Sequence, residues 1–294
     1  MRFLILTSLL GAALLSSCEE PRELSVKPTQ IVMDSRIQAD RSPEVSLRVV
    51  DGFGKTLKSD ALQDSKVTIQ AEATAAKTLR LSSFSDSSST FCTDYLIKAG
   101  VRYTLLIQAP GFSDLNSFTE VPDNVVAYTD TSGDKGPNGG LLPKGDRYLL
   151  PLVFDDPISE DNYYHVIVTV RDIDSDEDEV ISETLAFNIL PRPSDAKPFE
   201  ETSWIFGDKD FAGSRFRSNI VILKESIIKY PKPVVTIELR TVSVDYFNYY
   251  IQNSRPKSSD LPPHGQSGSI DNVAGGVGLF GGYSSYESSY QLEF

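Results

Sequence analysis

Short runs in which apolar and polar residues alternate are the feature that most constrains the fold of this 294-residue chain. Three runs in its first half are EVSLRVVDGFG, SKVTIQAEA and RYTLLIQAPGF, and later ones are YLLPLVF, NYYHVIVTV, LAFNIL and PVVTIELRTV. Side chains two residues apart lie on one face of a β-strand, so each run predicts a strand with one buried face. Turn-forming residues separate the runs, which indicates a mainly β protein.

The distribution of these runs predicts two β-sandwich-like domains. Residues 43–122 have the spacing of an Ig-like sandwich of about 80 residues. A Gly- and Pro-rich stretch without periodicity follows, and we interpret residues 123–147 as a linker or a long loop. Strand patterns resume in residues 148–294, which we expect to form a second β domain with one short helix.

The helix is predicted in VSVDYFNYYIQNSRP, where the apolar period changes. Val244, Phe247 and Ile251 recur at helical spacing, Ser243 can cap the amino end, and Pro256 stops any continuation. We expect this helix to pack across a sheet with its aromatic side chains in the core. A ligand-facing aromatic platform is the alternative.

The amino-terminal residues carry an export signal. Residues 1–17 combine an early arginine with an apolar run too short to span a bilayer, which takes about 20 apolar residues. The ending LLSSC has the form of a bacterial lipobox, in which Cys18 would be acylated. We therefore expect a lipid-anchored protein in which residues 18–42, polar and Pro-containing, form a tether.

Composition restricts the classes of partner. The chain has 41 acidic and 28 basic residues and a formal net charge of −13, which disfavours nucleic acid as a partner. Once Cys18 is acylated, Cys92 is the one remaining thiol, so no internal disulfide can form. We predict no cofactor.

The segment NVAGGVGLFGGYSS contains G-x-G-x-x-G at Gly276, Gly278 and Gly281, the spacing that cradles a pyrophosphate in dinucleotide-binding proteins. That role needs a helix, a strand and an acidic residue about 20 positions further on, and the chain ends at Phe294. We interpret the glycines as allowing positive φ or close backbone approach in a turn-and-strand segment. A recognition loop is the alternative.

The acidic run RDIDSDEDEVISE has the spacing of a calcium loop. Its first carboxylates are Asp172, Asp174, Asp176 and Asp178, but the position where an EF-hand needs glycine holds Glu177. We expect a solvated hairpin tip and predict no metal site, with weak calcium binding at these aspartates as the alternative.

The residue patterns predict no catalytic residue and a protein that is not an enzyme. His165 and His264, the only histidines, lack the spacing of a zinc site. His165 alternates out of phase with Tyr164 and Val166, so we expect it to point to solvent or to a neighbouring loop. No G-x-S-x-G nucleophile elbow occurs in the sequence.

Taken together, these segments resemble the Bacteroidetes lipoproteins of the domain-of-unknown-function 4249 (DUF4249) family. The resemblance spans nearly the whole sequence and is carried by the lipobox, GVRYTLLIQAPGF, EDNYYHVIV, FGDKDFAGSRF, VSVDYFNYYIQ and the ending SIDNVAGGVGLFGGYSS. It implies a transthyretin- or carboxypeptidase-regulatory-like sandwich followed by a family-specific β domain. It implies no known reaction and no known ligand.

The resemblance also implies a setting, because such lipoproteins are commonly encoded beside TonB-dependent outer-membrane receptors. We expect such a receptor as partner and an accessory role in nutrient uptake. Glu19 and Glu20 resemble the surface-export signal of these lipoproteins, which favours the outward face of the outer membrane.

Aromatic side chains are the predicted binding residues, because buried aromatic groups supply much of the energy of recognition. The residues we expect to make contacts are Trp204, Tyr249, Tyr250, Phe280 and Tyr283. Two alternatives are a secreted hydrolase that uses carboxylates at a domain cleft and a structural surface or adhesion module.

Overall fold

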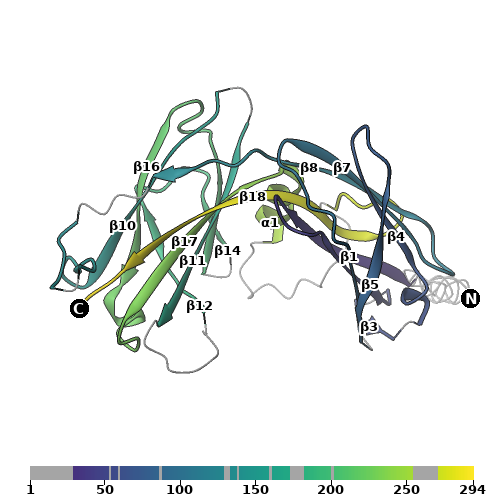
Figure 1. Cartoon of the computed structure of the whole chain (residues 1–294), viewed down its shortest axis with the longest axis horizontal. Coiled ribbons are helices and arrows are strands. Elements are labelled where there is room, and N and C mark those ends of the chain that lie inside the picture. The colour runs from purple at the N-terminus through teal and green to yellow at the C-terminus, as the bar shows by residue number, and fades with distance from the viewer. Residues whose placement is uncertain are drawn as a thin grey trace, which may run out of the picture.

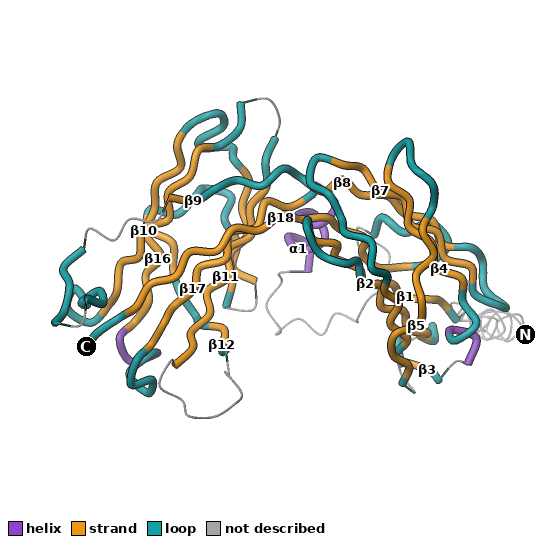
Figure 2. Tube along the Cα trace, in the orientation of Figure 1, coloured by secondary structure: helices purple, strands orange, loops and turns teal. Residues whose placement is uncertain are grey.

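The structure is a computed structural model that describes residues 29–52, 54–58, 60–85, 88–128, 133–137, 139–158, 161–172, 182–199, 202–253 and 271–294. Strands form two lobes, and helix α1 (Val244–Asn253) lies between them (Figures 1 and 2). The predicted mainly β class is confirmed. Within the described ranges, no helix combines the length and apolar character needed to cross a membrane.

The N-terminal lobe is a two-sheet sandwich. Its elements are β1 (Gln30–Gln38), β2 (Glu44–Val50), β3 (Thr56–Leu57), η1 (Asp60–Leu62), β4 (Lys66–Ala71), β5 (Lys77–Phe84), β6 (Ser89–Cys92), β7 (Val101–Gln108) and β8 (Leu115–Val121). One sheet has the order β1-β2-β6-β5 and the other β5-β4-β7-β8, because β5 pairs with β4 at one end and with β6 at the other.

The C-terminal lobe is a second sandwich. Its elements are β9 (Ala127–Tyr128), β10 (Arg147–Asp155), β11 (Tyr163–Asp172), β12 (Glu183–Thr184), β13 (Asn188–Leu190), β14 (Lys197–Phe199), β15 (Ser203–Gly207), β16 (Arg215–Leu223), η2 (Lys224–Ser226) and β17 (Pro233–Val242). The order β14-β15-β11-β17 faces the order β13-β16-β10-β9.

Each lobe has its own apolar core, supplied by the alternating residues of its strands. In the N-terminal lobe the predicted alternation of β2, β4 and β7 is confirmed, with buried Val45, Leu47, Val49, Val67, Ile69, Ala71, Tyr103, Leu105 and Ile107. In the C-terminal lobe β11 contributes Tyr164, Val166, Val168 and Val170. A third, smaller cluster lies between the lobes and includes Tyr246 and Tyr250 of α1.

One long strand, β18 (Val277–Gln291), belongs to both lobes (Figure 1, yellow). Its first part pairs in parallel with β1, from Val32↔Val277 to Gln38↔Tyr283. Its second part pairs antiparallel with β17, from Val242↔Tyr283 to Val234↔Gln291. The carboxyl-terminal strand therefore completes one sheet of each sandwich.

The tether predicted for residues 18–42 is too long. Residues 30–38 form β1, with Ile31, Met33 and Ile37 in the N-terminal core. The alternation of this strand is obscured at two positions: Ser35 is a polar residue on the buried face, and Val32 on the opposite face packs with Val50 and Val277. Residues 1–17 and Cys18 lie outside the described residues.

The stretch predicted as a linker, residues 123–147, is partly built into the C-terminal lobe. Residues 127–128 form β9, which pairs with β10. Leu141 is buried and bridges to Leu292 beyond β18. The stretch thus supplies an edge strand as well as a connection.

Candidate functional site between the two lobes

The glycines of NVAGGVGLFGGYSS allow β18 to pass between closely packed elements. Gly278 has φ +126°, and a Cβ there would overlap the carbonyl oxygen of Met33 in β1. A Cβ at Gly282 would lie 2.5 Å from the carbonyl oxygen of Glu120 in β8, and one at Gly281 would lie 3.0 Å from Cβ of Tyr246 in α1. The structural interpretation of the motif is confirmed, and the recognition-loop alternative does not fit residues 277–282, which form a buried strand. The turn before that strand is exposed at Ala274 and Gly275.

Helix α1 begins at a residue that also connects it to both lobes. The Oγ of Ser243 accepts hydrogen bonds from the main-chain N–H of Tyr246 (3.3 Å), the hydroxyl of Thr119 (3.1 Å) and the main-chain N–H of Gly282 (3.2 Å). The predicted cap is confirmed, and the same oxygen holds the helix start against β8 and β18.

Helix α1 packs its aromatic side chains into the cluster between the lobes, as predicted, but its most buried residues are tyrosines rather than Val244, Phe247 and Ile251. Tyr246 and Tyr250 are buried, whereas Val244 is 47 % exposed and Phe247 is half-buried. The two tyrosine rings stack with centroids 4.5 Å apart. Tyrosine takes the inner face because its hydroxyl finds polar partners beneath the helix.

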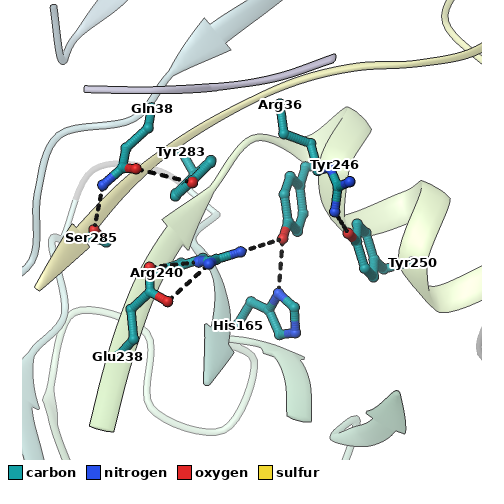
Figure 3. A network of polar contacts seen from close by, with 9 residues as sticks. All are labelled: Arg36, Gln38, His165, Glu238, Arg240, Tyr246, Tyr250, Tyr283 and Ser285. Carbon is teal, nitrogen blue, oxygen red and sulfur yellow. Dashed lines mark hydrogen bonds and ion pairs between the residues drawn. The ribbon is translucent and has the colours of Figure 1, made fainter. Parts of the chain in front are cut away.

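Those partners form a connected polar network (Figure 3). The hydroxyl of Tyr246 lies 2.9 Å from Nδ1 of His165 and accepts a hydrogen bond of 3.3 Å from Arg240. Arg36 of β1 donates to the hydroxyl of Tyr250 at 2.7 Å. The network thus joins the first strand of the chain to β11, β17 and α1.

Arg240 is the charged centre of this network. It donates two hydrogen bonds to Glu238, of 2.7 and 2.8 Å, and its guanidinium lies 4.6 Å from the ring centroid of Tyr283. The Tyr283 hydroxyl donates to the side-chain oxygen of Gln38, whose amide donates to Ser285. We call Arg36, His165, Glu238, Arg240, Tyr246, Tyr250 and Tyr283 the interlobe clasp.

His165 is buried, and the expectation that it points to solvent or a loop is wrong. Its side chain does alternate out of the C-terminal core, but α1 covers that outer face of β11. Burial and the neighbouring Arg240 and Arg36 lower the pKa of His165 to about 3. The imidazole is therefore neutral near pH 7, and its Nε2 has no hydrogen-bond partner among the described residues.

Arg240 stays charged despite its burial. Desolvation lowers its pKa, but the hydrogen bonds and charge of Glu238 and the nearby tyrosines raise it more, so the net pKa is above the ordinary value. The histidine of the clasp is neutral and buried and Glu238 is paired with Arg240, so Arg36 is the one clasp residue with an exposed charge. The chemistry of the clasp is that of a filled, hydrogen-bonded contact.

The predicted binding residues separate into three places. Tyr249, Tyr250 and Tyr283 lie in the cluster between the lobes, Tyr250 buried and the other two half-buried. Phe280 is fully buried in the N-terminal core, and Trp204 lies in the C-terminal lobe. Arg240 was not among the predicted site residues. Its position two residues after Glu238 in an apolar strand places both side chains on one face, which could have indicated the pair.

Trp204 lines a pocket of about 280 Å³ at the side of the C-terminal lobe. The lining residues are Ala186, Phe187, Asn188, Pro198, Trp204, Val221, Leu223 and Ser226. The indole Nε1 donates to the carbonyl oxygen of Phe187 at 2.9 Å, and the guanidinium of Arg192 lies 5.3 Å from the ring centroid. We call this the Trp204 pocket.

Two buried aspartates hold the loop of FGDKDFAGSRF. Asp156 accepts hydrogen bonds from the Tyr164 hydroxyl and from the main-chain N–H of Gly213, and Asp208 accepts one from Asn162. Burial raises the pKa of Asp156, and the nearby charge of Asp208 adds to that increase. Because these carboxylates bind main-chain groups, they order a loop.

The acidic run predicted as a hairpin tip is described only in part. Asp172 ends β11 and accepts a hydrogen bond of 3.1 Å from the main-chain N–H of Lys232. Asp174, Asp176 and Asp178 lie outside the described residues, as does His264. In the described part of the chain, no three potential ligands are grouped as a metal site.

Comparisons with known proteins locate the chain in one family. No curated protein matches the sequence. A crystal structure of a DUF4785 family protein from Legionella pneumophila subsp. pneumophila strain Philadelphia 1 is similar, with 7 % identity over 72 % of this chain and a TM-score of 0.24, which is too low to carry an argument. This chain matches 52 % of that protein, about half its length. The sequence profile of the domain of unknown function DUF4249 matches residues 19–289, and the chain therefore belongs to the DUF4249 family.

Proposed function

We propose that this protein is a binding protein, held at the outer membrane by acyl chains on Cys18 and displayed on the outward face. In this proposal it acts as an accessory to a TonB-dependent receptor in nutrient uptake. The lipobox supports the attachment to a membrane. The resemblance of the sequence to its family supports the outer membrane, its outward face and the receptor.

The proposal rests on the short connection between the predicted lipid anchor at Cys18 and the first strand of the N-terminal lobe. Gln30, the first residue of β1, follows the lipobox cysteine closely in the sequence. The chain from Cys18 to Gln30 can span at most about 40 Å, at roughly 3.3–3.6 Å per residue. A body restrained in this way stays within reach of a receptor in the same membrane.

The interlobe clasp supports binding rather than catalysis. His165 is neutral and covered, and Arg240 is paired with Glu238. Such a contact fixes the relative position of two sandwiches, so that surfaces on both lobes meet a partner without an entropic cost of ordering.

A carboxylate-dependent hydrolase is less well supported. It needs two close carboxylates with perturbed pKa values in a cleft. Among the described residues Asp156, whose pKa is raised by burial, lies near the carboxylate of Asp208. Both are buried and hydrogen-bonded to main-chain N–H groups. A purely structural surface module would have the same anchor but no ligand.

Metabolic labelling with a fatty acid tests the anchor, and purification in mild detergent tests the partner. Label is expected on the full-length protein and not on Cys18→Ala, and a TonB-dependent receptor is expected to co-purify with the lipidated form. Cys92→Ala, which keeps the lipobox, is the matched control and should label fully. Label on Cys18→Ala, or purification of the lipidated protein without any receptor, would contradict the proposal.

A further inference from the structure

We propose that the Trp204 pocket binds a small organic anion with a flat apolar body, the chemistry of an aromatic carboxylate. This inference rests on the proposed binding function, because it names the class of ligand that the C-terminal lobe takes. The pocket lies outside the interlobe clasp and uses none of its residues.

The size and lining of the pocket set the body of the ligand. Its volume of about 280 Å³ is slightly below the roughly 300–1,000 Å³ of sites for drug-sized molecules, so it suits a single ring. Six lining residues are apolar or aromatic, and Asn188 and Ser226 are the two with polar side chains. A flat apolar group with one hydrogen-bonding end fits this lining.

Trp204 is held in place before any ligand arrives. It is 5 % exposed, its strand β15 is paired on both sides by β14 and β11, and its Nε1–H bonds to the Phe187 carbonyl oxygen. An indole fixed in this way gives the pocket a rigid apolar wall that loses no rotamer freedom on binding.

The charge beside the pocket sets the charged end of the ligand. Arg192 is exposed and its guanidinium lies 5.3 Å from the ring centroid of Trp204, so this contact places a cation beside a lining residue. The ammonium group of Lys224 lies over the ring of Phe294, 5.7 Å from its centroid. A single arginine therefore supplies the positive charge at this site, in a chain whose net charge is −13.

A stacked guanidinium can still pair with an anion. Arginine presents its N–H groups in the plane of the guanidinium, so contact of its face with an indole leaves those groups directed outward. A ring in the pocket would place a short carboxylate arm near the arginine. The pairing is charge-assisted and selects anions over neutral molecules of the same shape.

The only tryptophan of the chain lines this pocket, so its fluorescence reports binding at the site. The probes are phenylacetate, neutral phenylacetamide and cationic phenethylamine, titrated into the chain that begins at Glu19. Phenylacetate is expected to change the Trp204 emission saturably, and calorimetry should give the same Kd. Phenylacetamide should bind about tenfold more weakly, which corresponds to one charge-assisted contact, and phenethylamine should not bind.

Two substitutions test the location, each with a matched control. Leu223→Asp adds a carboxylate to a 43 %-exposed rim residue and should weaken phenylacetate binding at least about tenfold. Leu190→Asp makes the same change at an exposed residue of the same sheet outside the lining and should leave binding unchanged. Arg192→Gln should weaken phenylacetate binding about tenfold without affecting phenylacetamide, whereas Arg217→Gln, at an exposed residue of β16, should change neither.

Three results would overturn the inference. Absence of saturable fluorescence and of heat with phenylacetate rules out the site. Equal binding of phenylacetate and phenylacetamide rules out the anionic end. Equal effects of Leu190→Asp and Leu223→Asp rule out the location. The anchor and receptor tests above do not depend on any of these outcomes, so failure of the two proposals can be told apart.

Discussion

The interlobe clasp and the Trp204 pocket are built from the same kinds of residue and differ in what covers them. Both stack an arginine on an aromatic ring, Arg240 on Tyr283 and Arg192 on Trp204. In the clasp, α1 covers the remaining side, and Arg240 is also paired with Glu238. Beside Trp204 an open pocket remains. Aromatic and arginine side chains thus hold the lobes together where α1 covers them, and they border an open pocket beside Trp204.

The two regions also differ in the span of sequence that builds them. The clasp joins β1, β11, β17, α1 and β18, whereas the pocket uses only residues between Ala186 and Ser226. Substitutions in the clasp should therefore change the free energy of unfolding of both lobes, and substitutions at the pocket rim should change binding alone.

The largest effect is expected where β18 passes β1. Gly278→Ala combines strain at φ +126° with overlap of the Met33 carbonyl group, and we expect a loss of at least about 3 kcal/mol in the free energy of unfolding. Gly111→Ala is the control, because Gly111 also has positive φ (+81°) but no atom within 4 Å of its Cβ position, and it should cost about 1 kcal/mol. Urea denaturation of both variants measures the difference. Equal losses in the free energy of unfolding would show that the close approach of β18 to β1 does not add to the effect.

The next effect is expected from unpairing the clasp. Arg240→Met leaves Glu238, in a pair whose side chains are each 18 % exposed, without its cation, and we expect a loss of about 3 kcal/mol. Arg147→Met breaks a pair with Asp146 whose side chains are 48 % and 73 % exposed, and should cost less than about 1 kcal/mol. Urea denaturation at low salt checks both values. A cost for Arg240→Met as small as that of the control would show that the clasp does not stabilise the junction.

The pH dependence of stability should distinguish His165 from exposed groups. Its pKa is lowered to about 3 in the folded state, below its ordinary 6.5, so the unfolded chain binds this proton more readily. Stability is therefore unaffected by this group above pH 6.5 and falls as the pH drops from about 6.5 towards 3, by up to about 1.4 kcal/mol per unit. His165→Asn should flatten this part of the curve of unfolding free energy against pH. An unchanged curve would contradict the burial of a neutral imidazole.

The smallest effect on stability is expected at the pocket rim. Leu223→Asp should change the free energy of unfolding by less than about 0.5 kcal/mol, because its side chain is already 43 % exposed. The same variant is the one expected to lose phenylacetate binding. If it instead unfolds as readily as Arg240→Met, the interlobe clasp and the Trp204 pocket do not differ in their contribution to stability, which would contradict the comparison.

Local pattern was enough to predict seven of the strands, β2, β4, β7, β10, β11, β13 and β17, but not others such as β5, β8 and β16. Alternation in β2, β4, β7 and β11 follows from one buried face per strand, and the cap of α1 follows from a single serine. These features depend on residues a few positions apart, which is the range over which a sequence pattern is directly readable.

The junction could not be predicted in the same way. The parallel pairing of Val32 with Val277 joins residues at opposite ends of the chain, and nothing local to either marks the partner. The burial of His165 depends on α1, and the face of α1 that is buried depends on where Arg36 and His165 place their polar atoms. Without those positions, the helical spacing pointed to Val244, which is 47 % exposed, as well as to Phe247 and Ile251, which do pack against the cluster between the lobes.

The most direct test of the account uses two residues that are unique in the chain beginning at Glu19. Trp204 reports unfolding of the C-terminal lobe by its fluorescence, and the free thiol of Cys92, at the end of β6, reports unfolding of the N-terminal lobe by its rate of labelling. If β18 and the interlobe clasp unite both sandwiches, the two probes will give one coincident transition in urea. Two separate transitions, with one lobe unfolding while the other stays intact, would contradict the claim that the carboxyl-terminal strand joins them into one folding unit.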